Sequence, residues 1–297
     1  MFSRRHPYLF FILVFSTLIT GTMITLSLLF TVGSKSYEFE FGEKVGVVEI
    51  KGVILESKKI IDDLKKFREE DSIKAIVLRI DSPGGGVGPS QEIFREVRKT
   101  VKSKKVITSM GSVAASGGYY IAAASNKIVA NPGTITGSIG VVMGYTNFQE
   151  LLAKIGLVPV VVKSGEYKDM GSPVRKMTEK ERNLLQAFVN TIHSQFVSDV
   201  AEGRGMDPGK VEKIADGSIF SGEKAKSLGM VDRLGNLEDA IEWAGRMAGI
   251  KGKVSAVYLE DKKFSLKRYI EGSFINNLVN RAINSNLYAA YLYRPGG

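Results

Sequence analysis

The chain has 297 residues, which is enough for one large domain or two small ones with a substantial hydrophobic core. With 44% hydrophobic and 24% charged residues, its composition is that of a globular protein and excludes a disordered or fibrous one. The net charge of +10 fits either a nucleic-acid partner or a basic surface beside anionic lipid, and the absence of cysteine excludes thiol nucleophiles, disulfides and thiolate metal sites.

Residues 8–32 form one stretch without a charged side chain. About 20 apolar residues are enough for a helix to span a bilayer. Arg4 and Arg5 precede the stretch, which predicts that the N-terminus stays in the cytoplasm and the bulk of the chain lies on the other side of the cell membrane. A cleaved signal peptide is the alternative, but its apolar core is shorter, about 7–15 residues. We therefore expect a retained single-pass anchor over residues 1–33 and a polar tether over 34–44.

Apolar strands then alternate with amphipathic helices. Strands are predicted at 45–50, 73–80 and 106–109, with helices at 58–68 and 91–102 between them. This order predicts an α/β domain with a mostly parallel sheet over residues 45–250. Later patterns predict a buried strand at 158–162, a long helix at 178–204 that Thr178 and Glu181 start as a capping box, and a helix at 237–247. Residues 251–297 are expected to hold a strand and a basic amphipathic tail, 264–283, that suits a membrane surface or a partner subunit.

Three glycine-rich turns follow predicted strands. The first contains Gly84, Gly85 and Gly86, and its free N–H groups could face an oxyanion. It lacks the Lys followed by Ser or Thr of a P-loop, so we do not expect a phosphate site there. The turn at 133–140 fits either a tight loop or a pocket that contains Ser138.

The remaining turn carries Ser116 between a predicted strand and a small-residue helix at 119–124. N–H groups at the start of a helix can hold negative charge. The geometry is similar to a nucleophile elbow, although the sequence is not Gly-x-Ser-x-Gly. On this segment alone, a packing turn in which the serine caps the helix is the simpler interpretation.

A nucleophilic serine needs a base, and the chain has only two histidines. His6 lies before the membrane segment, and nothing marks His193 as a base, so a Ser-His-Asp triad is not expected. Lysine remains, because burial lowers the pKa of an ammonium group and a neutral amine can accept the serine proton. On local grounds Lys168, on a loop after the strand predicted at 158–162, is one of several candidates, and it could equally be a surface lysine.

Four segments together resemble the signal peptide peptidase A family of membrane-bound bacterial serine proteases. They are DSPGGG at 81–86, ASGGYY at 115–120, TGSIG at 136–140 and SGEYK at 164–168. The resemblance covers about residues 45–250 and implies Ser116 as nucleophile, Lys168 as general base and Ser138 as the serine that hydrogen-bonds the lysine. The implied oxyanion donors are the N–H of Gly117 and one from the glycine turn, with Gly84 and Gly85 as candidates.

The same resemblance implies a crotonase/Clp-protease-like layered α/β spiral that assembles into rings, and an anchored endopeptidase that degrades leftover signal peptides. No metal, cofactor or nucleic acid is expected. A related protease that cleaves a stomatin-like membrane protein would share the dyad, and a non-catalytic membrane scaffold is the alternative of a different class. In double-length members the serine and the lysine come from different repeats. This single-copy chain is therefore expected to form a homo-oligomeric ring in which Lys168 of one protomer reaches Ser116 of its neighbour.

Overall fold

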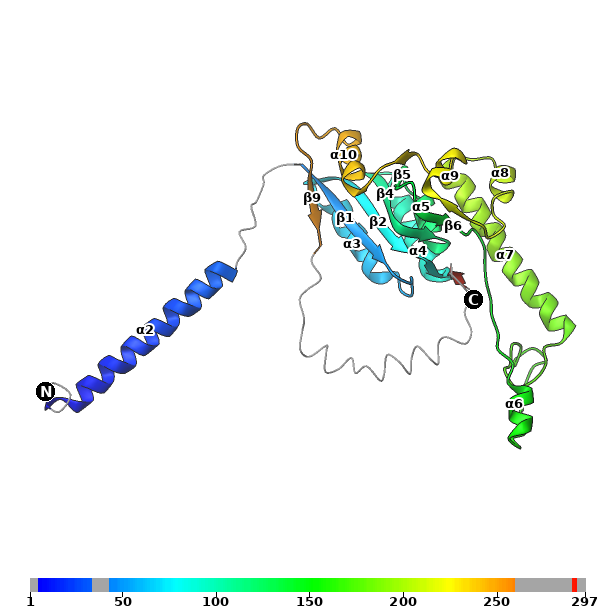
Figure 1. Ribbon diagram of the computed structural model, residues 1–297, viewed down its shortest axis with the longest axis horizontal. Helices are drawn as coiled ribbons and strands as arrows, with labels where there is room; N and C mark the ends of the chain where they lie inside the picture. Colours follow the sequence, from blue (N-terminus) through cyan, green and yellow to red (C-terminus); the bar gives the residue numbers. More distant parts are fainter. Residues whose placement is uncertain (1–4, 34–42, 260–289, 293–297) are drawn as a thin grey trace. The chain divides into compact units, whose positions relative to one another are not determined.

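The computed structural model describes residues 5–33, 43–259 and 290–292. The chain divides into two units, Met1–Gly42 and Glu43–Gly297. In the first unit, α2 (Pro7–Gly33) is one helix whose Pro7–Ser27 part is long and apolar enough to cross a membrane, by length and composition (Figure 1). Nearly all of the predicted tether and the whole predicted tail, 264–283, lie outside the described residues.

The second unit is built around a sheet that has eight strands among the described residues. Its main order is β7-β6-β4-β2-β1-β9, with β5 paired to β4 and β8 paired to β5 (Figure 1). The strands are β1 (Lys44–Lys51), β2 (Ile73–Ser82), β4 (Lys105–Ala115), β5 (Lys127–Ala130), β6 (Ile135–Gly137), β7 (Ile219–Ser221), β8 (Arg233–Leu234) and β9 (Ser255–Tyr258). Every pair is parallel except β6 with β7, which confirms the predicted mostly parallel α/β architecture.

Helices cover both faces of this sheet. The side chains of Ile76, Leu78 and Ile80 join a large core cluster, whereas Ala75 and Val77 join a smaller one on the opposite face. Because both faces are buried, the middle of β2 at 75–78 is a continuous apolar run. The larger cluster takes side chains from α3 (Lys58–Glu69), α4 (Val87–Thr100), α5 (Gly117–Ala123), α7 (Glu179–Arg204), α8 (Pro208–Glu212) and α9 (Gly222–Ser227), and the smaller one takes them from α10 (Leu237–Met247). The predicted helices are confirmed, with α4 beginning four residues before the expected position, 91.

The strand predicted at 106–109 is much longer in the structure, because β4 continues to Ala115. The β2–β4 register shifts between Ile80, which pairs with Met110, and Ser82, which pairs with Ala114. At this irregularity the Asp81 carboxylate accepts a 3.1 Å hydrogen bond from the N–H of Val113. Gly111 therefore lies in a bulge, and β4 extends past it to the residue before Ser116.

The buried strand predicted at 158–162 is wrong. These residues form no strand, and Val158, Val160 and Val162 are 82%, 85% and 95% exposed. They follow α6 (Gln149–Lys154), which lies apart from the sheet in Figure 1. An apolar β-branched run indicates a need for burial but does not say which surface will supply it. Within the described part of one protomer, no strand pairs with this run.

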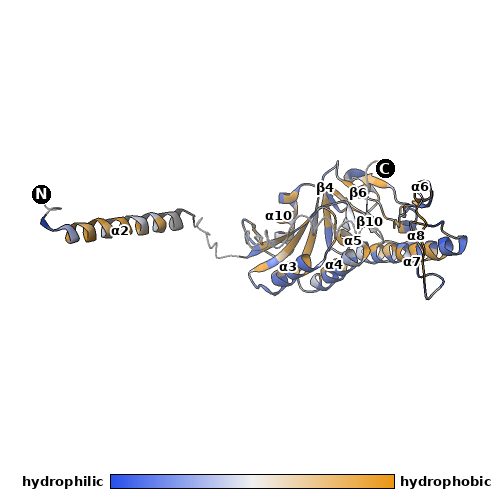
Figure 2. Ribbon diagram, turned by 90° about the horizontal axis from the view of Figure 1, so that it is seen from below, coloured by the Kyte–Doolittle hydropathy of each residue, from blue (hydrophilic) through white to orange (hydrophobic). Residues whose placement is uncertain are grey.

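The long helix α7 begins as predicted, with the reciprocal capping box of Thr178 and Glu181. Its apolar side chains are buried only in the second half, at Ile192, Phe196 and Val200. In the first half, Leu184 and Phe188 are nearly half exposed. Figure 2 shows alternating orange and blue along α7, as expected of an amphipathic helix, and in Figure 1 this helix runs beyond the sheet.

Candidate active site

Ser116 lies at the junction between β4 and α5, where the strand ends and the helix begins. It is the N-cap residue of α5, yet its side chain makes no capping hydrogen bond. The residue is 1% exposed, and its hydroxyl has no hydrogen-bond partner among the described residues. A buried hydroxyl that does not cap its own helix is available for chemistry.

The backbone of Ser116 has φ 53° and ψ −117°, a conformation that is unfavourable for a residue with a side chain. Ser138 has φ 51°, and these two serines are the non-glycine residues with positive φ in the described part of the chain. Such backbone conformations cost about 1–3 kcal/mol each and gather at functional sites. Both serines were candidates from the sequence, and both have this unusual geometry.

Sheet register brings the two serines together. In the parallel β4–β6 pair, Ala115 pairs with Gly137, and each serine is the next residue. The N–H of Ser116 donates to the carbonyl of Gly137 at 2.8 Å, and the N–H of Ser138 donates to the carbonyl of Ser218 at 2.7 Å. Ser138 is itself buried. The second and third glycine-rich turns therefore lie side by side at the ends of β4 and β6.

The first glycine-rich turn packs against the same junction. A Cβ on Gly117 would lie 2.7 Å from Ser90 Oγ and 3.2 Å from the Gly85 nitrogen. Only glycine fits this approach without displacing a neighbour. Gly117 is the first residue of α5, so its N–H has no carbonyl of a preceding turn to bond. Sequence reasoning missed Ser90, whose hydroxyl donates to the Gly86 carbonyl at 2.8 Å and supports this turn.

Two of the three backbone N–H groups in β3 (Gly84–Gly86) already donate hydrogen bonds within the protomer. The N–H of Gly84 donates to Ser82 Oγ at 3.1 Å, and the N–H of Gly86 donates to the carbonyl of Ile54 at 2.8 Å. In an extended strand, the N–H of the residue between them points to the opposite side. On that side β10 (Ala290–Leu292) pairs antiparallel with β3, and Tyr291 is the partner of Gly85.

Lys168 is not brought to Ser116. It is exposed, it lies on the segment between α6 and α7, and its ammonium group has no hydrogen bond or ion pair within residues 43–259. Its backbone N–H donates to the carbonyl of Gly165 at 3.2 Å. The structure therefore gathers Ser116, Ser138, Gly117 and Gly85 within one protomer and leaves the predicted base elsewhere.

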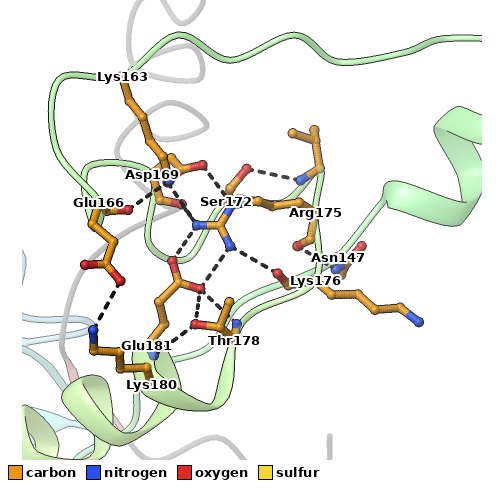
Figure 3. Close-up of polar contacts among 11 residues, drawn as sticks. Asn147, Lys163, Glu166, Asp169, Ser172, Arg175, Lys176, Thr178, Lys180 and Glu181 are labelled. Carbon is orange, nitrogen blue, oxygen red and sulfur yellow. Dashed lines mark hydrogen bonds and ion pairs between the residues drawn. The ribbon is translucent and has the colours of Figure 1, made fainter.

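A network of ion pairs and hydrogen bonds lies around residues 163–175, which contain Lys168 (Figure 3). Arg175 Nε and Nη2 donate to the two carboxylate oxygens of Asp169 at 2.8 and 2.9 Å. The same guanidinium bonds both carboxylate oxygens of Glu181, with Nη1 to Oε2 at 2.9 Å. Hydrogen bonds from Arg175 and Lys163 hold the pKa of Asp169 well below its usual range, and those from Arg175 and the Thr178 N–H lower the pKa of Glu181 to about 2.

The other histidine candidate has a structural role. The Nε2 of His193 lies 2.8 Å from the carbonyl oxygen of Ala215, to which a neutral imidazole can donate. His193 is half-buried on α7, and within residues 43–259 its ring forms no hydrogen bond with Ser116 or Ser138. The side-chain contact of His193 therefore fixes α7 to a neighbouring segment.

Two family profiles match the sequence. The profile of peptidase family S49 matches residues 98–251, just over half of the chain, and the Clp protease profile matches residues 50–134. The Clp match runs from the end of β1 through β5, the part of the chain that carries the glycine-rich β3 and Ser116. The expected crotonase/Clp-protease-like α/β fold is thereby confirmed.

Relatives from distant organisms agree with this assignment. A Synechocystis protein named "Putative protease slr0021" is 43% identical over 232 residues, which are 77% of this chain and 84% of that protein. "Putative protease MJ0651" of Methanocaldococcus jannaschii is 34% identical over 90% of this chain and 91% of its own length. "Putative signal peptide peptidase SppA" of Enterococcus faecium is 42% identical over 62% of this chain and 54% of its own length.

The S49 profile, the long alignments and the serine-bearing strand-to-helix junction agree with the resemblance inferred from the sequence motifs. The chain belongs to peptidase family S49, and it is a serine peptidase of the short, single-domain form.

Proposed function

We propose that this serine peptidase is a membrane-anchored endopeptidase that degrades leftover signal peptides with Ser116 as nucleophile and Lys168 as general base. The observation that carries the proposal is the Ser116 hydroxyl, which is buried, uncommitted among the described residues and held on a strained backbone beside Gly117 and Gly85. The substrate class is supported by the name of the Enterococcus faecium relative, a signal peptide peptidase.

The chemistry follows from these positions. A neutral Lys168 accepts the proton of Ser116 Oγ while the oxygen attacks the peptide carbonyl carbon. The N–H groups of Gly117 and Gly85 stabilise the tetrahedral oxyanion once the substrate takes the place of β10, whose Tyr291 pairs with Gly85 in the free enzyme. Lys168 then gives its proton to the leaving amine, and water repeats the sequence on the acyl-enzyme. Ser138 orients the lysine by a hydrogen bond.

Within one protomer Lys168 does not lie beside Ser116, so the proposed chemistry requires an active site built from two protomers. In a homo-oligomeric ring, Lys168 of one protomer would reach Ser116 of its neighbour. The apolar side chains that one protomer leaves exposed support such contacts, since large exposed apolar patches mark interaction surfaces. They are Val142, Phe148, Leu151, Ile155, Leu157, Val158, Val160, Val162, Leu184 and Phe188.

The N-terminal helix α2 would serve as the anchor. Its apolar stretch is longer than the core of most cleaved signal peptides. The arginines before it favour a cytoplasmic N-terminus, which places the peptidase unit on the extracytoplasmic side of the cell membrane. In that position the enzyme meets signal peptides left in the bilayer after preprotein processing.

The test uses the full chain in detergent with synthetic signal peptides as substrate. Cleavage that is lost in Ser116→Ala, together with fluorophosphonate labelling at Ser116, is the expected result. Sequencing of the products from a membrane fraction separates the two substrate classes: fragments of signal peptides support the proposal, whereas fragments of a stomatin-like membrane protein overturn its substrate assignment. No labelling and no cleavage by the folded protein would indicate a non-catalytic scaffold.

A further inference from the structure

We propose that Arg175 is a positioning residue that fixes Lys168 by binding the neighbouring Asp169 to the start of α7. The inference rests on the proposed role of Lys168 as general base. It is carried by the network of ion pairs and hydrogen bonds around residues 163–175, called the lysine loop below (Figure 3).

The fixed end of the network is Glu181. It lies in the first turn of α7, and its carboxylate is held by the capping box with Thr178. The Thr178 N–H donates to Glu181 Oε2 at 2.9 Å, and the Glu181 N–H donates to Thr178 Oγ1 at 3.2 Å. The Glu181 side chain is only 4% exposed. A carboxylate with this many constraints is a rigid anchor point on a 26-residue helix.

Arg175 connects this anchor to the lysine loop. Its planar guanidinium binds Glu181 on one side and Asp169 on the other, with two hydrogen bonds to each carboxylate. Nη2 also donates to the backbone carbonyl of Asp169 at 3.1 Å. Such a two-sided fork fixes orientation as well as distance, which a lysine ammonium cannot do. The residue held in this way is the immediate neighbour of Lys168.

The other side of Lys168 is held as well. Lys163 Nζ donates to Asp169 Oδ1 at 2.6 Å and to the carbonyl of Glu166 at 2.8 Å, which closes the loop on itself. Lys180 Nζ bonds Glu166 Oε1 at 3.3 Å and lies 5.4 Å from the centre of the Tyr167 ring. Both sequence neighbours of Lys168 therefore have side-chain partners, of which Asp169 has the stronger ones.

Lys168 lies between two residues that have partners, but its own ammonium group has no charged partner in residues 43–259, as is also true of Lys176. Lys163 and Lys180, by contrast, form ion pairs with carboxylates of the lysine loop. A loop that is held on both sides of an unpaired amine is suited to present that amine to a serine.

The test compares Arg175→Met and Arg175→Lys with the parent enzyme in the full chain. Misplacement of a catalytic group by about 1 Å can cost about 10²-fold in rate. We expect kcat of Arg175→Met to fall about 10²-fold with KM nearly unchanged, and Arg175→Lys to recover part of the loss. The rising limb of log kcat against pH should move to higher pH in Arg175→Met, because a cation is lost and the Asp169 carboxylate is left without its main partner beside the lysine.

Control variants distinguish the positioning role of Arg175 from the proposed role of Lys168 as general base. Arg246→Met removes an exposed arginine–carboxylate pair on α10 and should change neither kcat nor the pH profile. If Lys168→Ala keeps the parent activity, the base assignment is wrong and the role of Arg175 falls with it. If Lys168→Ala is inactive but Arg175→Met has the parent kcat and pH profile, only the positioning role is overturned. Should Arg175→Met fail to fold, Arg175→Lys decides. The parent kcat in this variant overturns the need for the guanidinium fork, and a reduced kcat with KM unchanged supports it.

Discussion

The backbone N–H of Ser116 donates a 2.8 Å hydrogen bond to the carbonyl oxygen of Gly137. The bond joins the residue after β4 to the last residue of β6, and it helps to hold Ser116 at φ 53°. The surrounding sheet therefore stabilises a backbone conformation that an isolated serine would avoid. This relationship leads directly to the first prediction.

Glycine at position 116 should give a more stable protein than alanine. Ser116→Ala keeps the strained φ and ψ with a Cβ, whereas Ser116→Gly removes the Cβ that disfavours them. We expect Ser116→Gly to exceed Ser116→Ala by about 1 kcal/mol in free energy of unfolding. Both should be inactive and should not react with a fluorophosphonate. Denaturant unfolding of the two variants measures the difference, and equal stability would show that the backbone there is unstrained.

The identity of the base predicts a pattern among three variants. Lys168→Ala and Lys168→Arg should both lose peptide hydrolysis, because arginine keeps its proton near neutral pH. His193→Ala should retain activity, since its imidazole contacts the Ala215 carbonyl. In the parent enzyme the log rate should rise between about pH 7 and 8, where enzymes tune catalytic lysines. Appreciable activity in Lys168→Arg, or a rate that falls over that range, would contradict a lysine base.

A shared active site predicts complementation between inactive proteins. Ser116→Ala and Lys168→Ala proteins are dissociated, mixed and reassembled, and peptide hydrolysis is measured before and after mixing. Recovery of activity is expected, because some interfaces then pair an intact serine with an intact lysine. Mixed oligomers that stay inactive would mean that the lysine loop folds back to the serine of its own protomer.

A methyl group at position 117 should disturb both the fold and the oxyanion donors. The added Cβ would approach Ser90 Oγ to 2.7 Å, so Gly117→Ala should destabilise the protein by about 1–3 kcal/mol and abolish activity. Ser90→Ala in the same chain should restore part of the stability. The matched control is Gly88→Ala in the first turn of α4, where nothing lies within 4 Å of the new Cβ and no loss of stability is expected. Thermal unfolding of the four proteins checks these effects.

The Arg175 network predicts a pH-dependent contribution to stability. The pKa of folded Glu181 is about 2, below its ordinary value of 4.5, chiefly because of the hydrogen bond from Arg175. A depressed carboxyl pKa stabilises the folded state fully above about pH 4.5, and this stabilisation is lost as the pH falls toward 2. Glu181→Gln keeps a capping acceptor but lacks the charge. Its Tm should lie below that of the parent at neutral pH, and the gap should close in acid; a gap independent of pH would argue against a charged contact.

Much of the fold could be predicted from local patterns. Apolar alternation and helical spacing located β1, β2, α3 and α10 within a few residues, and the Thr178 capping box located the start of α7. These features depend on neighbours a few positions apart, so one sequence contains them. The two serines were found through glycine-rich turns and family motifs, and their strained backbone required the structure.

The errors have a common physical origin. The apolar run at 158–162 predicts burial, but its valines are exposed in one protomer. Hydrophobicity indicates that a segment needs burial, but it does not identify the surface that buries it. The extension of β4 depends on the Asp81 carboxylate, more than 30 positions away from Val113. Likewise, Arg175 binds Asp169, six residues before it, and Glu181, six residues after it. The segment between Asp169 and the start of α7 is irregular, so no periodic pattern predicts which charged side chains meet.

The pairing of Ala290–Leu292 with Gly84–Gly86 bears on where a soluble version of this enzyme should end. A protein shortened after residue 259 would keep the main sheet but lose β10, and the edge at Gly85 would then have unpaired backbone groups. Another extended chain could add there, whether a substrate, an inhibitor or a second molecule in a crystal. Rates and affinities measured on such a shortened protein would therefore be those of an open β3 edge. In the longer chain β10 pairs with the same edge.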